Sequence, residues 1–576
     1  MNWCHCGTEG WVPKFNQGGM MKLTGAVSGV VIGLLALALS AQADVKKVMV
    51  VLKSNSNSSG MVTSGAQVAA LNTFAQQLQD NQFKVQSTLK ALNSVVVEVK
   101  NAQDLLDLRN NPQVALVDED VMLPAPKPIY GVFNYHLSTQ ASVQTLATFG
   151  ATSNSPWGIQ AIHAPKAWKV SKSGRGARIA VLDTGIDKDH PALAKNLELG
   201  LDFVRDTTTA PYPFADGVGH GTHVAGTIAG ALDASGFSGV APQAKILMGR
   251  VCSVEGCSSV AIAEGINWGI EQKVDVISMS LGGALSPPSI RMAIQKAETD
   301  GIVVVAASGN DGTARVGYPA ALETVIAVGA VDSSISRAKF SQYGVELDIC
   351  APGVEVVSSL PLGSGRESVI TVIDSSGKAV KLANAAVQGA GEFLGKLKGE
   401  FVATGIGQPE DFAKVNVKGK VALMGRGTIP FTDKVINAMH AGAIAVIIHN
   451  NEPGLVRGGI QPPEPVNIPV FIIEQQPGLD MIKAIGEGQV LQTEMSIEAT
   501  DYGALDGTSM ATPHVAGVIA LMKAANKKLT PLQVREIIKN TAAPMSVNAN
   551  NECGAGLIDA ASAVSSARLA RLPTSH

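Results

Sequence analysis

The chain has 576 residues, enough for several domains that each bury a large core. Its 45 basic and 48 acidic residues give a net charge of −3 and no basic run stands out, so no nucleic acid is expected as a partner. Hydrophobic residues make up 46% of the chain and aromatic residues only 4%, a balance typical of an α/β protein rich in alanine, valine and glycine.

The N-terminal segment predicts export. From residue 20 the chain carries a lysine, an apolar run and then the small residues Ala41-Gln42-Ala43, which is the order found in a signal peptide. We expect residues 20–43 to be removed, and residues 1–19 to be a leader or a mis-assigned start. The alternative is an uncleaved membrane anchor, because the apolar run is near spanning length. The Ala-x-Ala exit favours cleavage, so no stable membrane anchor is expected.

Residues 44–124 alternate strand and helix patterns. VKKVMVVLK, SVVVEVK and VALVDEDVML are strand-like, a weaker strand precedes SVVVEVK, and GAQVAALNTFAQQLQ and AQDLLDLRNN have helical spacing. The resulting β-α-β-β-α-β order predicts a ferredoxin-like α+β domain. Residues 125–153 continue the proline-rich PAPKP and then become polar and poorly periodic, which indicates a linker in which the chain is processed.

A parallel sheet is predicted from residue 154 onward. RIAVLD, KILMGRV, VDVISMSL, GIVVVAAS and TVIAVGAV are short apolar runs suited to strands buried on both faces, and helical segments separate several of them. They predict a doubly wound α/β domain. We assign it residues 154–360 and 501–565, with an inserted segment at 361–500 and a tail at 566–576. Ligands bind beyond the carboxyl ends of such strands, where Asp183 ends one run and Asn310 follows another.

Four cysteines follow the predicted cleavage site: Cys252, Cys257, Cys350 and Cys553. An even number in an exported chain permits two disulfides, and a bond between the first two would close a short surface loop. The connectivity of the other two stays open. The alternative is four free thiols, because cysteine is often simply a buried small residue.

Three glycine-flanked segments carry the groups of a reactive serine. GTSMATPHVAG places Ser509 at the start of an apolar helix, VLDTGID carries Asp183, and GHGTHVAG carries His220. A serine hydroxyl is a poor nucleophile near neutral pH unless a base takes its proton, and a carboxylate fixes the tautomer of that base. Imidazole titrates near neutrality, so His220 is the expected general base and then acid. Taken alone, the serine would be a helix N-cap and the aspartate a turn residue.

The three segments, in the order Asp, His, Ser, resemble those of the subtilisin-like serine proteases, the subtilases. PWGI at residues 156–159 and ASGN at residues 307–310 extend the resemblance. It implies that Asp183, His220 and Ser509 are the catalytic triad of a secreted serine endopeptidase that works through an acyl-enzyme.

The flanking and inserted segments carry resemblances of their own. KGKVALMGRGTIPFTDKVINAMHAGAIAVIIHNN, within residues 361–500, resembles the small β-rich protease-associated (PA) domain inserted in many subtilases. Residues 44–124 resemble the inhibitory propeptide of that family, which implies a self-processed zymogen whose own propeptide is an intramolecular inhibitor. The alternative is an independent ferredoxin-like domain with some other ligand.

The resemblance also implies supporting residues. Asn310 is expected to donate its side-chain amide to the oxyanion, together with the N–H of Ser509. An extended substrate would pair with the SLGG segment, and the implied substrate-binding residues are Ser280, Leu281, Gly282, Gly309 and Gly317. The three glycines would leave room for a primary side chain. No charge is placed to pair a basic one, so large apolar or broad selectivity is expected. His223 and His514 would pack or hydrogen-bond within their own helices.

We expect no required cofactor, protein or peptide substrates, and a monomer. Many subtilases bind structural calcium, and Asp233 could contribute ligands. Ala192, however, stands where calcium-binding relatives commonly have aspartate, so the strong calcium site is unsupported. A second hypothesis is a cell-surface binding protein in which the PA insert does the work and the triad is vestigial. Intact Asp183, His220, Asn310 and Ser509 argue against it.

Overall fold

The computed structural model describes residues 46–53, 65–126, 129–133, 155–206, 211–232, 237–387, 390–391, 395–456, 459–460, 462–545 and 552–570. The predicted leader, signal peptide and most of the processing linker lie outside these ranges, as does Asp233. Of the helices that the structure does describe, none has the length and apolar character needed to cross a membrane.

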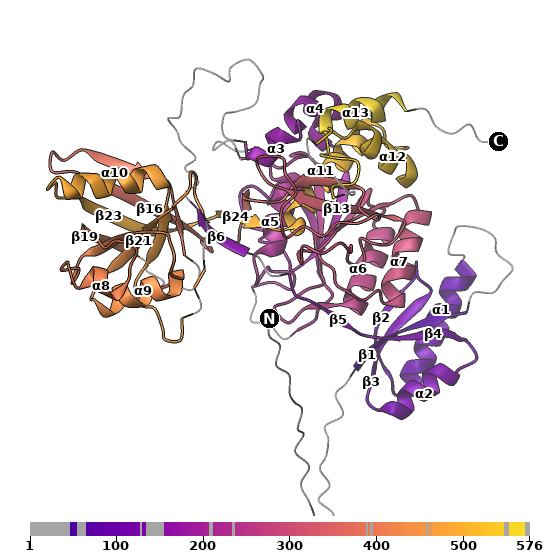
Figure 1. Ribbon diagram of the computed structural model, residues 1–576. Helices are drawn as coiled ribbons and strands as arrows, with labels where there is room; N and C mark the ends of the chain where they lie inside the picture. Colours follow the sequence, from indigo (N-terminus) through magenta and orange to yellow (C-terminus); the bar gives the residue numbers. More distant parts are fainter. Residues whose placement is uncertain are drawn as a thin grey trace, which may run out of the picture. The chain divides into compact units, whose positions relative to one another are not determined.

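The N-terminal domain has the predicted β-α-β-β-α-β order (Figure 1). Its elements are β1 (Lys46–Leu52), α1 (Gly65–Asp80), β2 (Lys84–Leu89), β3 (Ser94–Val99), α2 (Ala102–Asn110) and β4 (Val114–Glu119). The strands form an antiparallel sheet in the order β2-β3-β1-β4, which confirms the ferredoxin-like prediction and its weak second strand.

Strand β1 is apolar on both faces because both faces are covered. Val48 and Val50 pack with Leu71 and Phe74 of α1 in the core of the N-terminal domain. Met49, on the opposite face, belongs to the large core cluster of the sheet domain that follows. Alternate side chains of a strand point to opposite faces, so this run of buried residues ties the two domains together.

The central domain contains the predicted parallel sheet. Its seven strands lie in the order β14-β13-β12-β11-β7-β9-β8, and every neighbouring pair is parallel. The strands are β7 (Arg178–Asp183), β8 (Leu197–Asp202), β9 (Lys245–Arg250), β11 (Val276–Met279), β12 (Val303–Ala307), β13 (Val325–Val331) and β14 (Ile349–Pro352). Strand β7 lies where the order reverses, which is the point at which ligands bind in such sheets.

Helices cover both faces of this sheet. Helices α5 (His220–Ala229) and α11 (Thr508–Ala525) pack together on one face, and α6 (Ser259–Glu271) and α7 (Pro288–Thr299) pack together on the other. The remaining helices are α3 (Trp157–Ala161), α4 (Ala164–Ser171), the short 3-10 helix η1 (Lys172–Gly174), α12 (Pro531–Thr541) and α13 (Ala560–Leu569). Two short strands, β5 (Met122–Leu123) and β10 (Cys257–Ser258), form a separate antiparallel pair.

The inserted segment forms most of a third sheet, in the order β15-β24-β6-β18-β22-β21-β20-β19-β23-β16-β17. Its strands are β6 (Ile129–Phe133), β15 (Val356–Ser359), β16 (Gly365–Ile373), β17 (Ala379–Leu382), β18 (Asn384–Ala386), β19 (Gly395–Ala403), β20 (Val421–Gly425), β21 (Ala445–His449), β22 (Val470–Ile473), β23 (Gln492–Thr500) and β24 (Tyr502–Asp506). Strands β19, β20, β21 and β22 are mutually parallel. Helices α8 (Pro409–Phe412), α9 (Phe431–His440) and α10 (Gln475–Gly486) accompany them, so the insert is β-rich but also has a small α/β centre.

All four cysteines after the predicted cleavage site are paired, as Cys252–Cys257 and Cys350–Cys553. The alternative of four free thiols is therefore wrong. The first bond closes the predicted short loop, whose tip at Val254 is 76% exposed, while both of its cysteines are fully buried. The second joins β14 to a segment 203 residues away, beyond the insert.

Candidate active site

Asp183 and His220 form a buried pair at the carboxyl end of β7. Asp183 is the last residue of β7, and His220 is the first residue of α5. The His220 Nδ1 atom donates a hydrogen bond of 2.8 Å to Asp183 Oδ1, and both side chains are at most 2% exposed. The helix can approach the strand because position 221 is glycine: a Cβ there would lie 2.2 Å from the main-chain oxygen of Gly185.

The surroundings of His220 favour its protonated form. Burial alone would lower the pKa of this imidazole, but the charge and hydrogen bond of Asp183, with a further contribution from Asp216, raise the pKa above its ordinary value of 6.5. The sequence indicated only an unperturbed value. A base with a raised pKa binds a proton more strongly, which suits it to take one from a hydroxyl.

Asp216, which the sequence analysis did not single out, binds the start of α5. Its carboxylate accepts hydrogen bonds from the N–H groups of Val218, Gly219 and Thr222 at 2.7 to 3.0 Å, at the start of α5. It also accepts from the hydroxyls of Thr184 and Thr222. A carboxylate suits this position because the first turn of a helix presents unpaired N–H groups. The acidic residue four positions before His220 was the signal available in the sequence.

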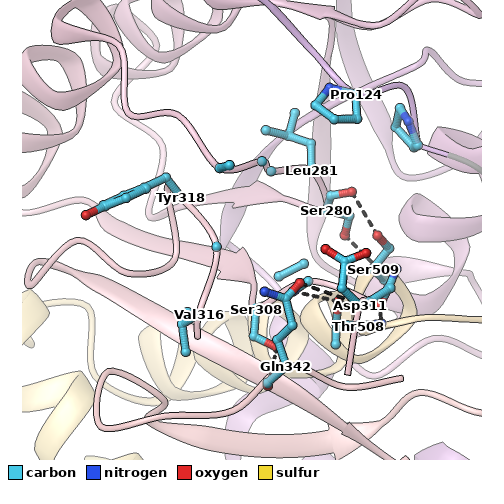
Figure 2. A pocket seen from close by; sticks show the side chains of 18 of the residues that line it. Pro124, Ser280, Leu281, Ser308, Asp311, Val316, Tyr318, Gln342, Thr508 and Ser509 are labelled. Atoms are coloured by element: carbon cyan, nitrogen blue, oxygen red, sulfur yellow. Dashed lines mark hydrogen bonds between the residues drawn. The ribbon is translucent and has the colours of Figure 1, made fainter. Parts of the chain in front are cut away.

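Ser509 lies in the first turn of α11, against the segment that follows β11. Its hydroxyl donates to the main-chain oxygen of Ser280 at 3.0 Å, and the Ser280 hydroxyl donates to the main-chain oxygen of Ser509 at 2.8 Å (Figure 2). Among the contacts of the described residues, the partner of the Ser509 hydroxyl is thus Ser280 and not His220. Both His220 and Ser509 line one cavity of about 890 Å³.

The cavity gathers most of the predicted site residues. It is lined by His220, Ser280, Leu281, Gly282, Gly309, Asn310, Gly317 and Ser509. Asp183 is not part of the wall, since it lies behind His220 and is fully buried. Residues that are up to 289 positions apart in the chain, from His220 to Ser509, therefore meet at the carboxyl edge of the central sheet.

Asn310 is held in a fixed orientation by the helix that carries the serine. Its Oδ1 atom accepts hydrogen bonds from the N–H of Thr508 at 2.9 Å and from the Thr508 hydroxyl at 2.8 Å. The same hydroxyl accepts the N–H of Gly309 at 3.2 Å. Because the oxygen of the amide is occupied, its Nδ2 is the atom that can donate into the cavity. The sequence identified Asn310, but it gave no sign that Thr508 orients it.

The glycines of the cavity wall differ in what they do. A Cβ on Gly282 would lie 2.7 Å from the main-chain oxygen of Tyr318, and Gly309 has a φ of +113° with Gln342 Oε1 where its Cβ would be. At these two positions glycine is needed for close packing, in addition to the role in the cavity wall that the sequence predicts. Gly317 meets the main-chain oxygen of Ser308 at 3.3 Å and is the more open position.

Three charged residues that the sequence reading did not anticipate also line the cavity. Asp311 and Arg315 lie in the exposed loop after β12, and Asp506 is the last residue of β24. The wall therefore holds two acidic groups and one basic group, whereas the sequence analysis expected no charge placed to pair a basic side chain.

Two further histidines are buried and stay neutral. Burial lowers the pKa of His223 to about 3 and that of His514 to about 4. His514 bonds to Met510 within its own helix, as predicted. His223 instead bonds to the main-chain oxygens of Val356 and Gly503 on neighbouring strands, so it fastens α5 to β15 and β24. Neither lines the cavity that contains His220 and Ser509.

Comparison with known proteins identifies the family of the central domain and of the insert. A model of the subtilase family matches residues 174–387 and 476–556, and a model of the PA domain matches residues 395–481. The chain belongs to the subtilase family. It is 38% identical to subtilisin NAT of Bacillus subtilis subsp. natto over 286 residues, which are 49% of this chain and 67% of the relative. It is 44% identical to a subtilisin of Bacillus pumilus over 214 residues, 36% of this chain and 76% of the relative.

A solved structure supports the same assignment. The subtilase is similar to the psychrophilic subtilisin-like protease Apa1 from the Antarctic psychrotroph Pseudoalteromonas sp. AS-11, with a TM-score of 0.54 and 27% sequence identity. The match covers 72% of this chain and 99% of that one. Together the matches show a serine-type endopeptidase with a PA insert, whose substrates are proteins.

The end of the N-terminal domain reaches the cavity of this subtilase. Strand β5 pairs with β10, and Pro124, Ala125 and Pro126 line the same cavity as Ser509. Just upstream, the Asp120 carboxylate accepts hydrogen bonds from the first turn of α6, and Asp118 accepts the N–H of Ser289 in α7. Each carboxylate lies where a helix exposes unpaired N–H groups.

One position bears on the calcium site that many subtilases have. Ala192 is fully buried, and its methyl group cannot act as a ligand. This position therefore lacks the carboxylate that calcium-binding relatives commonly have. The described residues contain no group of three or more histidine, cysteine, aspartate or glutamate side chains that could hold a metal ion.

Proposed function

We propose that this subtilase is a secreted endopeptidase, made as a zymogen that cuts itself, with Asp183, His220 and Ser509 as its catalytic triad. The observation that carries the proposal is the buried 2.8 Å pair of His220 and Asp183 beside a cavity that Ser509 lines. Three groups of these types in that arrangement are what an activated serine requires.

In the proposed reaction the Ser509 oxygen attacks the carbonyl carbon of the substrate. Rotation about the Cα–Cβ bond of Ser509 would move its hydroxyl from the Ser280 oxygen to the Nε2 atom of His220, which takes the proton. Asp183 holds the Nδ1 proton and stabilises the imidazolium that forms. His220 then gives its proton to the leaving amine, and a water molecule activated by the same base hydrolyses the acyl-enzyme.

The negative charge of the tetrahedral intermediate needs donors. The Asn310 Nδ2 atom and the main-chain N–H of Ser509 are the proposed pair. Support comes from Thr508, which occupies the oxygen of the Asn310 amide, and from the position of Ser509 in the first turn of α11, where N–H groups and the helix dipole favour negative charge.

The substrate is proposed to lie extended along Ser280, Leu281 and Gly282, with large apolar or broad selectivity for the primary side chain. Backbone hydrogen bonds to a strand edge tolerate many sequences. Buried Val316 and the glycine at position 317, which both line the cavity, support an apolar primary side chain. The chemistry uses side chains and main-chain groups alone, so no cofactor is included, and we propose a monomer.

The N-terminal domain is proposed to inhibit the enzyme until it is cut away. Its support is the position of Pro124 to Pro126 on the wall of the cavity that Ser509 lines. Export is proposed from the signal-like residues 20–43, and the two disulfides of the described chain fit an oxidising compartment.

The precursor with Ser509→Ala tests the triad and the self-processing together. Expressed in a host without other proteases, it is expected to stay at full length, whereas the unchanged precursor is cut between the N-terminal domain and residue 154. Mass measurement and N-terminal sequencing read the result. In the matured wild-type enzyme, a serine-directed phosphonylating reagent is expected to label Ser509 alone. Normal maturation of the Ser509→Ala precursor, or no labelling of Ser509, would refute the proposal.

A further inference from the structure

The Cys252–Cys257 disulfide joins two parts of the active-site region. Cys252 follows β9, and its N–H donates to the main-chain oxygen of Asp183 at 3.1 Å. Cys257 is the first residue of β10, where it pairs with Leu123. Both cysteines are fully buried. One covalent bond thus connects the end of β9, which is hydrogen-bonded to the main chain of Asp183, to the strand that pairs with Met122 and Leu123.

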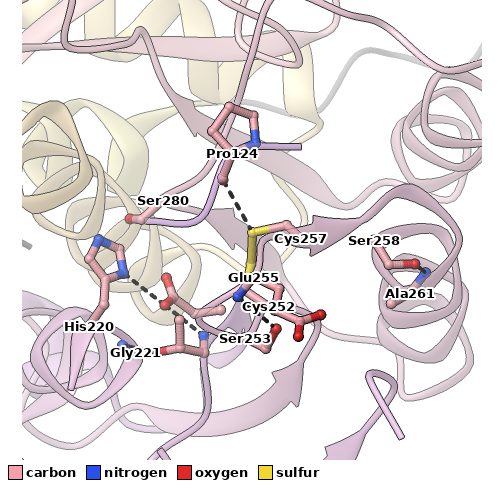
Figure 3. The surroundings of a disulfide bond; sticks show 12 residues. Pro124, His220, Gly221, Cys252, Ser253, Glu255, Cys257, Ser258, Ala261 and Ser280 are labelled. Carbon is pink, nitrogen blue, oxygen red and sulfur yellow. Dashed lines mark hydrogen bonds and ion pairs between the residues drawn. A yellow bond between two sulfur atoms is a disulfide. The ribbon is translucent and has the colours of Figure 1, made fainter. Parts of the chain in front are cut away.

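Strand β10 packs closely against the backbone of Met122 to Pro124, at the end of the N-terminal domain. Leu123 is the partner of Cys257, and Met122 is the partner of Ser258. The main-chain oxygen of Pro124 lies 3.8 Å from the sulfur of Cys257 (Figure 3). A disulfide sulfur carries no proton, so this is a packing contact. Gly256 has a φ of +147°, and a Cβ there would lie 2.6 Å from the Leu123 oxygen, so only glycine allows the chain to come this close.

Strand β10 is held by few contacts besides its pairing with β5. It is two residues long, and among the described strands it pairs with β5 and with no other. On its C-terminal side Ser258 caps α6, where its hydroxyl accepts the N–H of Ala261. On its N-terminal side lie the turn from Ser253 to Gly256, closed by an N–H···O bond of 2.8 Å, the backbone bridge between Cys252 and Cys257, and the disulfide. Short strand pairs are marginal in water, so when the N-terminal domain is absent the disulfide is the covalent link that fixes the N-terminal end of β10.

We propose that the Cys252–Cys257 disulfide is a positioning device for the substrate. It holds β10 where residues well upstream of the scissile bond can pair with it, in the way that Met122 and Leu123 do. Long peptides therefore depend on the disulfide, while the chemical step at Ser509 does not. This inference rests on the proposed function, because it takes the cavity as the substrate site.

The second disulfide provides a matched control. Cys350 lies in β14, and neither Cys350 nor Cys553 lines the cavity. Removing it also removes two sulfurs and one covalent link, but it leaves β10 untouched. A general loss of stability would follow from either removal, whereas a loss confined to long peptides would follow only from removal of Cys252–Cys257.

The test compares two product-like peptides from the chain itself as competitors of a short ester substrate. One peptide spans residues 118–126 (DEDVMLPAP) and includes the residues that pair with β10, and the other spans residues 124–126 (PAP) and does not. In the matured wild-type enzyme the longer peptide is expected to bind more tightly. In the variant with Cys252→Ser and Cys257→Ser, its inhibition constant is expected to rise about tenfold, the size of one or two lost backbone hydrogen bonds.

Three further measurements show whether the weaker inhibition by the longer peptide comes from β10. The inhibition constant of the shorter peptide and kcat for the ester are expected to stay within about twofold. The variant with Cys350→Ser and Cys553→Ser is expected to keep the wild-type ratio between the two peptides. Gly256→Ala, which leaves the disulfide intact but puts a methyl group against the incoming chain, is expected to weaken the longer peptide as well.

The outcomes separate this inference from the proposed function. If wild type fails to hydrolyse the ester, the proposed function is wrong. If the ester is hydrolysed but the Cys252/Cys257 variant keeps the wild-type ratio, or the Cys350/Cys553 variant loses it equally, the positioning role is wrong. Should the first variant not accumulate, wild type reduced with tris(2-carboxyethyl)phosphine is measured instead, with alkylation and peptide mass mapping to identify the opened bond, and the same ratios decide.

Discussion

Two sets of parallel strands in the described part of this molecule end near polar groups, and the cavity that Ser509 lines opens at one of them. In the central sheet, Asp183 ends β7 and Ser280 follows β11 beside the cavity of about 890 Å³. In the PA insert, Gly425 and His449 end β20 and β21, but Lys434 of α9 fills the space between the strand ends and the helix. Its ammonium group donates to the main-chain oxygens of Ile406 and Gly425. Parallel strands supply a crevice, and the side chains decide whether it is a site.

The buried ionisable groups at these two sets of strand ends, Lys434 and His220, have pKa values shifted in opposite directions. Burial lowers the pKa of Lys434, and the more distant charge of Asp411 only partly opposes this. His220 is just as buried, yet its pKa is raised, because Asp183 is hydrogen-bonded to it and Asp216 is near. A charged partner in contact thus reverses the effect of desolvation. The pKa of the buried lysine and that of the proposed base differ in direction because only His220 has such a partner in contact.

Removing the charge of Asp183, the partner of His220, should have the largest effect on catalysis. For Asp183→Asn we expect kcat to fall about 10⁴-fold, the size of the loss measured for the equivalent change in serine protease triads. Neutral His220 is the active form, so kcat/KM of the wild-type enzyme should rise with pH through a pKa above 6.5. Without Asp183, burial lowers the pKa of His220, and the rising limb should move to lower pH.

The measurement is the pH dependence of kcat/KM for a short ester between pH 4.5 and about 9 in both enzymes. A rising limb that stays in place when Asp183 is changed would mean that His220 does not owe its pKa to this carboxylate, and the contrast with Lys434 would fail.

Removing the oxyanion donor should have the next largest effect. For Asn310→Ala we expect kcat to fall about 10²- to 10³-fold with little change in KM, because the amide would act mainly in the transition state. That size comes from subtilisin, the relative for which such a donor was measured. Thr508→Val, which removes the hydroxyl that binds Asn310 Oδ1, should lose less, since the N–H of Thr508 still holds that oxygen. Equal losses in the two variants would contradict the assigned orientation of the amide.

The sequence located these groups because their short glycine-flanked segments resemble those of subtilases; taken alone, the serine would be a helix N-cap and the aspartate a turn residue. Asp183, His220, Asn310 and Ser509 all lie where local pattern predicted a boundary between elements. The partners of these groups could not be found in the same way. Thr508 reaches Asn310 across 198 positions, and Ser280 binds Ser509 across 229. Contacts at such separations come from the packing of whole elements, which a single sequence does not reveal.

The fold, like the site, was predicted within each module but not where the modules meet. Five strands of the central sheet followed from apolar runs, and their parallel direction followed from the helices between them. The sequence analysis did not anticipate β8, whose residues are partly exposed, or the four-residue β14. The union of the PA strands with β15 and β24 of the flanking segments in one sheet could not be predicted, since edge pairing depends on how two modules meet. The close packing of Gly282 and Gly309 could not be foreseen for a similar reason: their neighbours, Tyr318 and Gln342, come from other loops.

Changing Asp216, the second carboxylate near His220, should have a smaller effect on catalysis than changing Asp183. For Asp216→Asn we expect kcat/KM to fall on the order of 10- to 100-fold, because the start of α5 loses its ionised acceptor and His220 is held less firmly. Asp216 also helps to raise the pKa of His220, so the rising limb should move to lower pH by less than it does in Asp183→Asn. The pH dependence of kcat/KM for wild type, Asp183→Asn and Asp216→Asn measures these two shifts. A shift larger than that of Asp183→Asn would reverse the ranking of the two carboxylates.

Changing the buried cation should leave catalysis almost untouched. In Lys434→Met the side chain keeps its length, but two buried carbonyl oxygens lose their donor, which we expect to cost about 1–3 kcal/mol of the stability of the PA insert. Differential scanning calorimetry reads that loss, and kcat/KM for a short ester should stay within about twofold. Lys414→Met removes an exposed lysine of the same insert, 72% accessible, and should leave the unfolding midpoint unchanged. A drop in activity of more than tenfold in Lys434→Met alone would show that the two sheet edges are coupled, and the closed edge would then be part of the enzyme's working machinery.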